Sequence, residues 1–313
     1  MNTDRSVKVK DIVDKFQMEV IFEGKDYETE TLTITDVNRP GLQFIGFFDY
    51  FDPRRLQIIG KSETTFLKSF SSGERRKCFE DIFRHEIPAL VISRNLDVFP
   101  ECLEMAKKYG RTLLRTGYTS VEFTSMTIDY LNHELAPVIT RHGVLMDVYG
   151  EGVLILGDSG IGKSETAIEL IKRGHRLVAD DAVEIKRIGG TLFGTAPELI
   201  RNYLEVRGVG VIDVQKLFGM GAVQDSTQID LVIQFEKWAD DKYYDRLGLD
   251  ERFTSIMDVR VPMSVIPVSA GRNLAGIVEL AVMNNRQKKH GCNSAHDFVN
   301  QIDSYVDCHT PQD

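Results

Sequence analysis

Cysteine is scarce in this sequence, and its spacing excludes the commonest cysteine-based sites. The 313 residues include four cysteines, and no two of them form a C-x-x-C pair: Cys78, Cys102, Cys292 and Cys308. Neither a disulfide framework nor a zinc site follows from this spacing, so we expect free thiols.

Positive charge and long apolar runs are also lacking. The formal net charge is -9 and the pI about 5.4, which argues against nucleic acid as the main partner because phosphate-backbone binding needs a basic face. No apolar run reaches transmembrane length, and the first residues lack a signal-peptide core. We therefore expect a soluble cytoplasmic protein with no membrane partner. The chain is long enough to form two domains, and its 42% of apolar residues can form their cores.

Glycine is concentrated in the motif around which the chain is organised. The segment Gly157-Asp158-Ser159-Gly160-Ile161-Gly162-Lys163-Ser164 matches G-x-x-x-x-G-K-[ST]. The apolar run 153–156 before it predicts a buried strand, and the apolar spacing over 164–171 predicts a helix. We call Gly157–Ser164 the phosphate loop.

The chemistry of this loop follows from its backbone. Successive N–H groups around a glycine-rich turn form a concavity that binds anions, and the positive end of the next helix points to the same place. Lys163 can reach the outer phosphates, and the Ser164 hydroxyl can bind Mg²⁺. The segment therefore predicts phosphate binding.

Residues 1–132 have the alternating strand and helix patterns of an α/β domain. The patterns predict helices at 7–16, 73–83, 100–109 and 124–135, and strands at 31–37, 41–48, 57–59 and 89–93. The domain shows no catalytic set of residues, so we expect a regulatory or assembly role. The segment 133–137 marks the boundary with a second domain, 133–313.

The second domain is predicted to be rich in strands. The tight connection Gly150–Gly152 predicts an antiparallel hairpin between strands at 141–149 and 153–156. A strand from Arg176 is expected to continue through to Ile188 and to turn at Gly189-Gly190 into the next strand, 191–193. Further strands are expected at 209–214 and 229–235, and helices at 273–285 and 294–306.

Two adjacent carboxylates, Asp180 and Asp181, follow Lys163 by 17 and 18 residues. Neighbouring residues on a strand point to opposite faces, so we expect them to have different tasks. One could hold a metal ion or its water and the other could act as a base. The alternative is a solvated turn at the end of the strand.

Three further segments carry candidate residues. Glu205 is a candidate Mg²⁺ ligand and Arg207 a candidate phosphate contact beside Gly208 and Gly210, although E-x-R pairs commonly form surface ion pairs. The segment Pro267-Val268-Ser269-Ala270-Gly271-Arg272 is a turn before a helix, a place that suits an anion. The polar segment 238–252, which contains Arg246, is expected to be a mobile loop.

Together these motifs resemble the HPr kinase/phosphorylase family. The resemblance rests on six segments that extend nearly throughout the second domain: Arg-His142-Gly, Gly-Asp-Ser-Gly-Ile-Gly-Lys163-Ser164, Gly-His-Arg-Leu-Val-Ala-Asp180-Asp181, Glu205-Val-Arg-Gly-Val-Gly, Tyr-Asp-Arg246-Leu-Gly and Pro267-Val-Ser-Ala-Gly-Arg272-Asn. The first domain has the family's length and is less diagnostic.

The resemblance implies an α/β fold with an N-terminal α/β domain and a C-terminal P-loop kinase domain similar to the nucleotide domain of phosphoenolpyruvate carboxykinase. It implies phosphorylation of a serine of HPr, a phosphocarrier protein of the sugar phosphotransferase system, with ATP or pyrophosphate as donor. It also implies removal of that phosphate by phosphorolysis, which releases pyrophosphate. The family forms homohexamers and takes part in carbon catabolite repression.

The resemblance also implies roles for individual residues. Lys163 and the loop amides hold phosphates, Ser164 and Glu205 hold Mg²⁺, and one carboxylate of the aspartate pair moves the serine proton. His142 and Arg246 are catalytic in the family, and the segment 267–272 is linked to dephosphorylation. From the sequence alone a single histidine is more often structural. Our hypothesis is that Asp181 is the base and that Asp180 supports the metal.

Two other functions fit part of the sequence. A small-molecule kinase of the carboxykinase type would share the phosphate loop, but it would not need the first domain or the segments at Glu205 and Pro267. A GTPase switch would carry D-x-x-G followed by N-K-x-D; Asp245–Gly248 fits the first pattern, and no N-K-x-D follows it.

Overall fold

The computed structural model describes residues 5–239, 242, 249–269 and 271–309, and the chain forms two compact units, Met1–Pro137 and Val138–Asp313. Both units are mixed α/β, as the sequence predicts. The expected division after residue 132 falls within helix α5 (Ser120–Glu134). Among the described residues, no helix is both long and apolar enough to span a membrane.

A five-stranded sheet forms the centre of the first unit, in the order β2-β7-β6-β5-β4. Strands β4 (Val37–Asn38), β5 (Leu56–Ile59), β6 (Ala89–Ile92) and β7 (Thr112–Arg115) are parallel, and β2 (Glu19–Phe22) pairs antiparallel with β7. The short strands β1 (Val7–Lys8) and β3 (Thr31–Leu32) form a separate pair.

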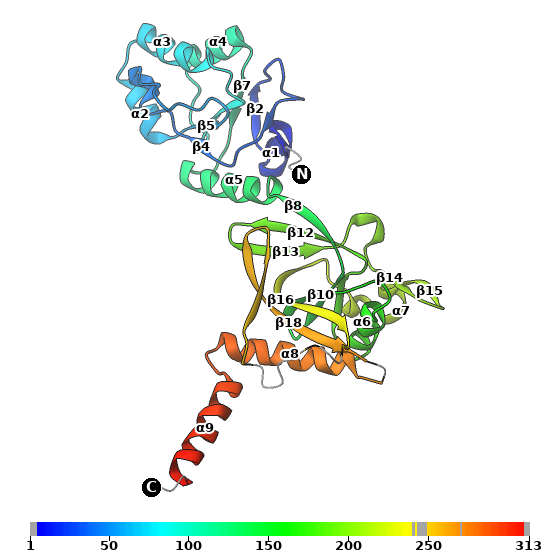
Figure 1. Cartoon of the computed structure of the whole chain (residues 1–313). Helices are drawn as coiled ribbons and strands as arrows, with labels where there is room; N and C mark the ends of the chain where they lie inside the picture. Colours follow the sequence, from blue (N-terminus) through cyan, green and yellow to red (C-terminus); the bar gives the residue numbers. More distant parts are fainter. Residues whose placement is uncertain (1–4, 240–241, 243–248, 270, 310–313) are drawn as a thin grey trace. The chain divides into compact units, whose positions relative to one another are not determined.

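Helices cover both faces of this sheet (Figure 1). Helices α1 (Val9–Phe16) and α5 pack on one face, and α2 (Lys61–Lys68), α3 (Ser72–Phe83) and α4 (Pro100–Tyr109) pack on the other. Alternate residues of β6 serve the two cores: Ala89 and Val91 face α1 and α5, whereas Leu90 and Ile92 face the other helices. This period of two is the pattern of a strand that is buried on both faces.

Three details of the first unit differ from the prediction. The expected strand at 41–48 is wrong, because the segment contains the 3₁₀ helix η1 (Gln43–Ile45) after the Pro40-Gly41 turn. The expected strand at 31–37 is two separate strands, β3 and β4. Helix α5 begins four residues earlier than predicted, because the Thr119 hydroxyl accepts a hydrogen bond from the Glu122 N–H while the Glu122 carboxylate accepts one from the Thr119 N–H.

The second unit is built on a nine-stranded sheet whose main path runs β11-β9-β10-β16-β13-β12-β8. Its strands are β8 (Val138–His142), β9 (Val144–Val148), β10 (Glu151–Leu156), β11 (Arg176–Ala179), β12 (Ala182–Ile188), β13 (Thr191–Thr195), β16 (Ser226–Lys237), β17 (Arg252–Ile256) and β18 (Val259–Val268). Strand β18 pairs with both β16 and β17. The predicted hairpin is confirmed, since β9 and β10 pair antiparallel.

The expected continuous strand from Arg176 to Ile188 is wrong. It breaks at Asp180-Asp181, where Asp181 has a φ of 67°. The first part, β11, pairs with β9, whereas the second part, β12, pairs with β8 and β13. The predicted turn at Gly189-Gly190 is confirmed, because Ile188 pairs with Thr191.

The three strands β10, β16 and β18 run parallel, so their carboxyl ends meet at one edge of the sheet. The phosphate loop follows β10 at this edge and leads into α6 (Lys163–Lys172), and the segment 267–272 begins at the end of β18 and leads to α8 (Leu274–Lys289). Helices α6 and α8 share one apolar core with this part of the sheet. The opposite face packs against residues of β12, β13, β17 and β18.

The remaining elements of the second unit are short, apart from the last helix. A small two-stranded sheet consists of β14 (Tyr203–Val206) and β15 (Gly210–Asp213), where the sequence predicted a strand at 209–214. Around it lie η2 (Glu198–Ile200), α7 (Val214–Phe218) and η3 (Met220–Ala222). The last helix is α9 (Ser294–His309).

Candidate active site

The phosphate loop adopts a backbone conformation that requires glycine at three positions. Gly157, Gly160 and Gly162 have φ angles of 149°, 76° and 105°, in the region that side chains with a Cβ rarely adopt. A Cβ on Gly157 would also lie 2.8 Å from the Phe235 carbonyl oxygen, and one on Gly160 would collide with the Arg207 guanidinium. The loop can therefore wrap closely around an anion.

Lys163 is the first residue of α6, and its side chain turns back over the loop. Its Nζ donates hydrogen bonds to the carbonyl oxygens of Gly157 (2.8 Å) and Asp158 (3.0 Å), and the residue is only 7% exposed. The ammonium group is thus held inside the curve of the loop, where it can contact a phosphate bound there.

Asp180 lies at the end of β11 and is only 6% exposed. Its carboxylate accepts hydrogen bonds from the Ser164 hydroxyl (3.2 Å) and from the Glu205 backbone N–H (3.1 Å). Burial raises the pKa of this carboxyl above its ordinary value, and these hydrogen bonds offset part of the rise. One carboxylate therefore links the end of the phosphate loop to β14.

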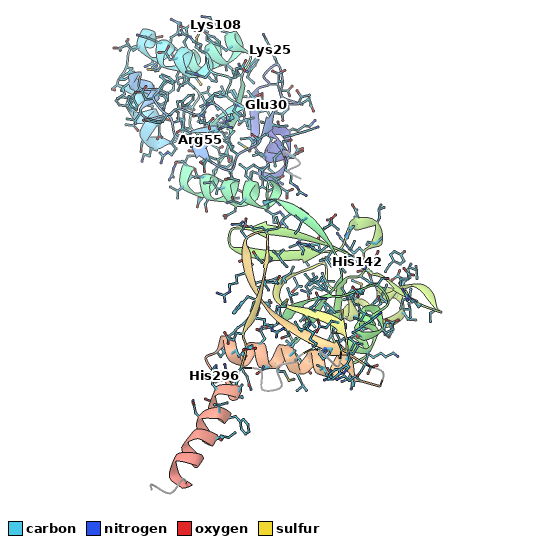
Figure 2. The ribbon with its side chains drawn as sticks, in the orientation of Figure 1. Lys25, Glu30, Arg55, Lys108, His142 and His296 are labelled. Carbon is cyan, nitrogen blue, oxygen red and sulfur yellow. The ribbon has the colours of Figure 1, made fainter. Side chains whose placement is uncertain are left out.

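Asp181 differs from its neighbour in both exposure and partner. Its side chain is 69% exposed, and its Oδ1 lies 2.9 Å from Nδ1 of His142, which ends β8. Figure 2 shows His142 among the side chains of the second unit. Because the chain bends at these two aspartates, the side chain of Asp180 is buried in the protein and that of Asp181 is exposed to solvent.

Arg207 follows β14 and reaches the phosphate loop, where its Nη2 donates to the Ser159 hydroxyl at 3.3 Å. The turn after it relies on Gly208 and Gly210, whose φ angles are 84° and 103°. This tight turn between β14 and β15 lets Glu205 and Arg207 approach the loop from the same strand end.

A cavity of about 100 Å³ brings most of the predicted residues together. Its lining includes His142, Ser159, Gly160, Gly162, Lys163, Ser164, Glu165, Asp180, Asp181, Glu205 and Arg207. Glu165 was not among the residues predicted from the sequence. Its position directly after the G-K-S end of the motif, in the first turn of the helix, was the signal that could have found it.

The two ends of the segment 267–272 line a different cavity. Arg272 Nη1 donates to the Pro267 carbonyl oxygen (2.6 Å), and both residues line a hollow of about 690 Å³ beside β17, β18 and α8. Val268 ends β18, and Ser269 and Gly271 lie in the turn that follows it. Arg246 and Ala270 lie outside the described residues, as does the D-x-x-G match at 245–248.

A metal ion at this site would depend on few protein ligands. No group of three or more His, Cys, Asp or Glu side chains within the described part of the chain is arranged to hold a metal. The cavity lining nevertheless contains a hydroxyl and several carboxylates, and such oxygen donors are those that Mg²⁺ accepts alongside water and substrate phosphates.

Family models match both units of this chain. A family model described as the HPr serine kinase C-terminal domain matches residues 133–302, and one described as the HPr serine kinase N terminus matches residues 7–131. This chain belongs to the HPr serine kinase family. The family resemblance inferred from the motifs is therefore confirmed.

Relatives in the HPr serine kinase family match nearly the whole chain. The HPr kinase/phosphorylase of Caldanaerobacter subterraneus is 52% identical over 297 residues, which cover 95% of this chain and 97% of that protein. The HPr kinase/phosphorylase of Bacillus licheniformis is 45% identical over 302 residues, with 96% and 97% covered. A solved structure of the HPr(Ser) kinase/phosphatase from Coxiella burnetii is 36% identical and covers 49% of this chain and 99% of that chain, with a TM-score of 0.46.

Proposed function

We propose that this chain is an HPr kinase/phosphorylase. It transfers a phosphoryl group from ATP or pyrophosphate to a serine of HPr, and it removes that group by phosphorolysis, within carbon catabolite repression. The observation that carries the proposal is the different environment of two adjacent aspartates at the phosphate loop. Asp180 is buried against Ser164, and Asp181 is exposed beside His142.

In the kinase direction, Asp181 accepts the proton of the serine hydroxyl as its oxygen attacks the terminal phosphorus of the donor. His142, 2.9 Å from Asp181, holds that carboxylate in position. The bond from phosphorus to the donor's bridging oxygen breaks, and ADP or phosphate leaves. Lys163, the loop amides and Arg207 supply positive charge and N–H donors where charge develops on the phosphoryl oxygens.

In the reverse direction, an oxygen of inorganic phosphate attacks the phosphorus of phosphoserine. The bond to the serine oxygen breaks, and the protonated Asp181 returns its proton to that oxygen. The products are pyrophosphate and free serine. Both directions move a phosphoryl group between a serine oxygen and a phosphate oxygen, so one set of donors serves both.

Mg²⁺ is the metal that we propose for this site, with Ser164 and Glu205 as its ligands and Asp180 in support. The Ser164 hydroxyl already donates to Asp180, whose second contact is the Glu205 backbone, so the three residues lie together. When bound, Mg²⁺ would neutralise part of the negative charge of the phosphates.

We also propose a dephosphorylation role for the segment 267–272 and a homohexameric assembly. The segment 267–272 begins at the sheet edge that carries the phosphate loop, which supports its role in dephosphorylation. Exposed apolar side chains on α8 and α9, such as Leu280, Met283 and Phe298, are consistent with a homohexamer. The cytoplasmic location, the role of Arg246, the regulatory or assembly role of the first domain and the likeness to carboxykinase stay predictions.

A small-molecule kinase is the second candidate, and the surface beside the site favours a protein acceptor instead. In the β14–β15 pair, Tyr203 and Val211 share a face with Glu205. Val211 is 68% exposed and Val209, in the adjoining turn, 72% exposed. Exposed apolar side chains next to a reaction centre are typical of a docking surface for another protein.

The test is a phosphotransfer assay. Purified protein, Mg²⁺, ATP and HPr are mixed, and phosphoserine on HPr is followed by mass spectrometry; excess phosphate is then added and pyrophosphate is measured. We expect serine phosphate to appear and then to leave as pyrophosphate. Phosphorylation without pyrophosphate release would reduce the function to a protein kinase. ATP binding without phosphorylation of HPr would favour the small-molecule kinase.

A further inference from the structure

A charged cluster lies behind the phosphate loop and joins three segments of the second unit. Its centre is Glu279 on α8, whose Oε2 lies 2.9 Å from Nη1 of Arg173 and whose Oε1 lies 2.9 Å from Nε2 of His175. The hydroxyl of Tyr149, in the β9–β10 turn, donates to Oε1 at 3.5 Å, and its ring meets the His175 ring edge-on at 4.6 Å. None of these residues lines the cavity at the phosphate loop.

The histidine and the central carboxylate of the cluster are largely buried, whereas Arg173 (32% exposed) and Tyr149 (46% exposed) lie at its edge. His175 is 5% exposed, and the side chain of Glu279 is 15% exposed. Burial alone would raise the pKa of Glu279, but the hydrogen bonds from His175 and Arg173 hold it below its ordinary value. The carboxylate is therefore ionised at neutral pH and binds both partners.

Arg173 extends the cluster to the start of α8. Its Nη2 donates to Oδ1 of Asn273 at 3.4 Å, and the same oxygen accepts the Gly276 N–H at 3.1 Å as the N-terminal cap of the helix. Its Nε lies 3.2 Å from Oε1 of Glu169 on α6. One guanidinium thus spans the end of α6, the body of α8 and the cap of α8.

The first residue of α8 lies against the phosphate loop. A Cβ built on Gly162 would be 3.7 Å from Cδ1 of Leu274. Because Asn273 is the preceding residue and Arg173 holds it, a shift of this cap would move Leu274 and would change the wall behind Gly162.

We propose that Arg173, held by Glu279, is a positioning residue that fixes the start of α8 beside the phosphate loop and thereby sets how tightly the site binds small phosphates. The inference rests on the proposed use of ATP, pyrophosphate and inorganic phosphate at this one site. ATP gains further binding from its nucleoside, whereas phosphate and pyrophosphate depend only on the groups that contact phosphate, chiefly the loop. A shift of Leu274 away from Gly162 should therefore weaken the binding of phosphate and pyrophosphate more than the binding of ATP.

The test uses the full chain and compares Arg173→Gln, Glu279→Gln and the conservative Arg173→Lys with the wild type. Steady-state KM values are measured for phosphate, pyrophosphate and ATP with HPr or phosphorylated HPr as the second substrate. We expect Arg173→Gln and Glu279→Gln to raise the KM for phosphate and pyrophosphate about fivefold to tenfold and the KM for ATP less than twofold. Arg173→Lys keeps the positive charge but can make fewer of the three contacts, so it should recover part of the loss.

Arg76→Gln is the control, because Arg76 also pairs with a glutamate, Glu104, at 2.9 Å, but at the surface of the first unit. It should leave all three KM values unchanged. Equal rises in the KM for ATP and for the small phosphates, or a fall in kcat with unchanged KM values, would overturn the inference. A merely structural role of Arg173 would not change the KM values for phosphate and pyrophosphate selectively. Calorimetric titration with pyrophosphate and with ATP gives the same comparison without turnover, so it decides the inference even if HPr is not the acceptor.

Discussion

Nδ1 of His142 lies 2.9 Å from Oδ1 of Asp181, although the two residues are 39 positions apart in the chain. The pairing of β8 with β12 places His142 opposite Ala182 and brings the imidazole to the exposed carboxylate. If Asp181 is the base, Asp181→Asn should lower kcat by about 10²-fold or more in both directions, because a positioned base contributes roughly that factor. Phosphorylation and phosphorolysis rates measure this.

Asp258→Asn is the control for that experiment. Asp258 is an exposed aspartate of the same unit with a similar positive φ of 62°, and it should keep full activity when substituted. His142→Gln should reduce kcat less than Asp181→Asn does, because it leaves the carboxylate in place. Normal rates in Asp181→Asn would rule out the assigned base.

Asp180→Asn should change the metal dependence of the reaction. Asp180 accepts from Ser164 and from the Glu205 backbone, the two residues proposed to hold Mg²⁺. Loss of such a supporting carboxylate typically weakens a metal site by about 10-fold to 100-fold. The Mg²⁺ concentration for half-maximal rate should rise by about tenfold in Asp180→Asn and stay near the wild-type value in Asp181→Asn. The reverse pattern would exchange the two roles.

The stability of the first unit should depend on pH through Glu101. The hydrogen bonds from Arg75 and Ser72 lower the pKa of this buried carboxyl from 4.5 to about 2. A lowered folded-state pKa contributes stability that is full above the ordinary pKa of 4.5 and is lost as the pH falls toward 2. Glu101→Gln should therefore cost roughly 2–3 kcal/mol at pH 7, and the difference should narrow at pH 3.

Amide hydrogen exchange of peptides from α4 and β7 measures this loss locally. Glu104→Gln is the matched control on the same helix, because Glu104 pairs with Arg76 at the surface. An exposed ion pair contributes at most about 1 kcal/mol, so this variant should exchange almost like the wild type. Equal protection in Glu101→Gln and in the control would contradict the prediction.

A substitution on the apolar face beside Glu205 should change the KM for the protein substrate and leave the KM for ATP unchanged. Val211→Ser removes an exposed apolar side chain from the face of the β14–β15 pair that carries Glu205. We expect the KM for HPr to rise about fivefold, which corresponds to roughly 1 kcal/mol of lost apolar contact, with the KM for ATP unchanged. Val121→Ser, at an equally exposed valine on α5, should change neither value. A change in oligomeric state of Val211→Ser would instead assign this face to contacts between subunits.

The phosphate loop and its flanking strand and helix could be predicted because all of their determinants are contiguous. Three glycines that permit positive φ, a lysine and a serine lie within eight residues, and the apolar periods on either side specify the strand and the helix. The turn at Gly189-Gly190 and the β9–β10 hairpin were predictable for the same reason, since each depends on a few adjacent residues.

Only the tertiary structure decided which residues from distant segments lie together at the phosphate loop. Periodicity predicted one strand from Arg176 to Ile188, but β11 and β12 find different partners, and the bend between them separates the environments of Asp180 and Asp181. The contact of His142 with Asp181 and that of Arg173 with Asn273 likewise depend on strand pairing and helix packing between distant segments. The sequence by itself determined the local conformations, because backbone sterics act over a few adjacent residues. The arrangement of the site was decided by pairing between distant strands, because the free energy of that pairing comes from residues far apart in the chain.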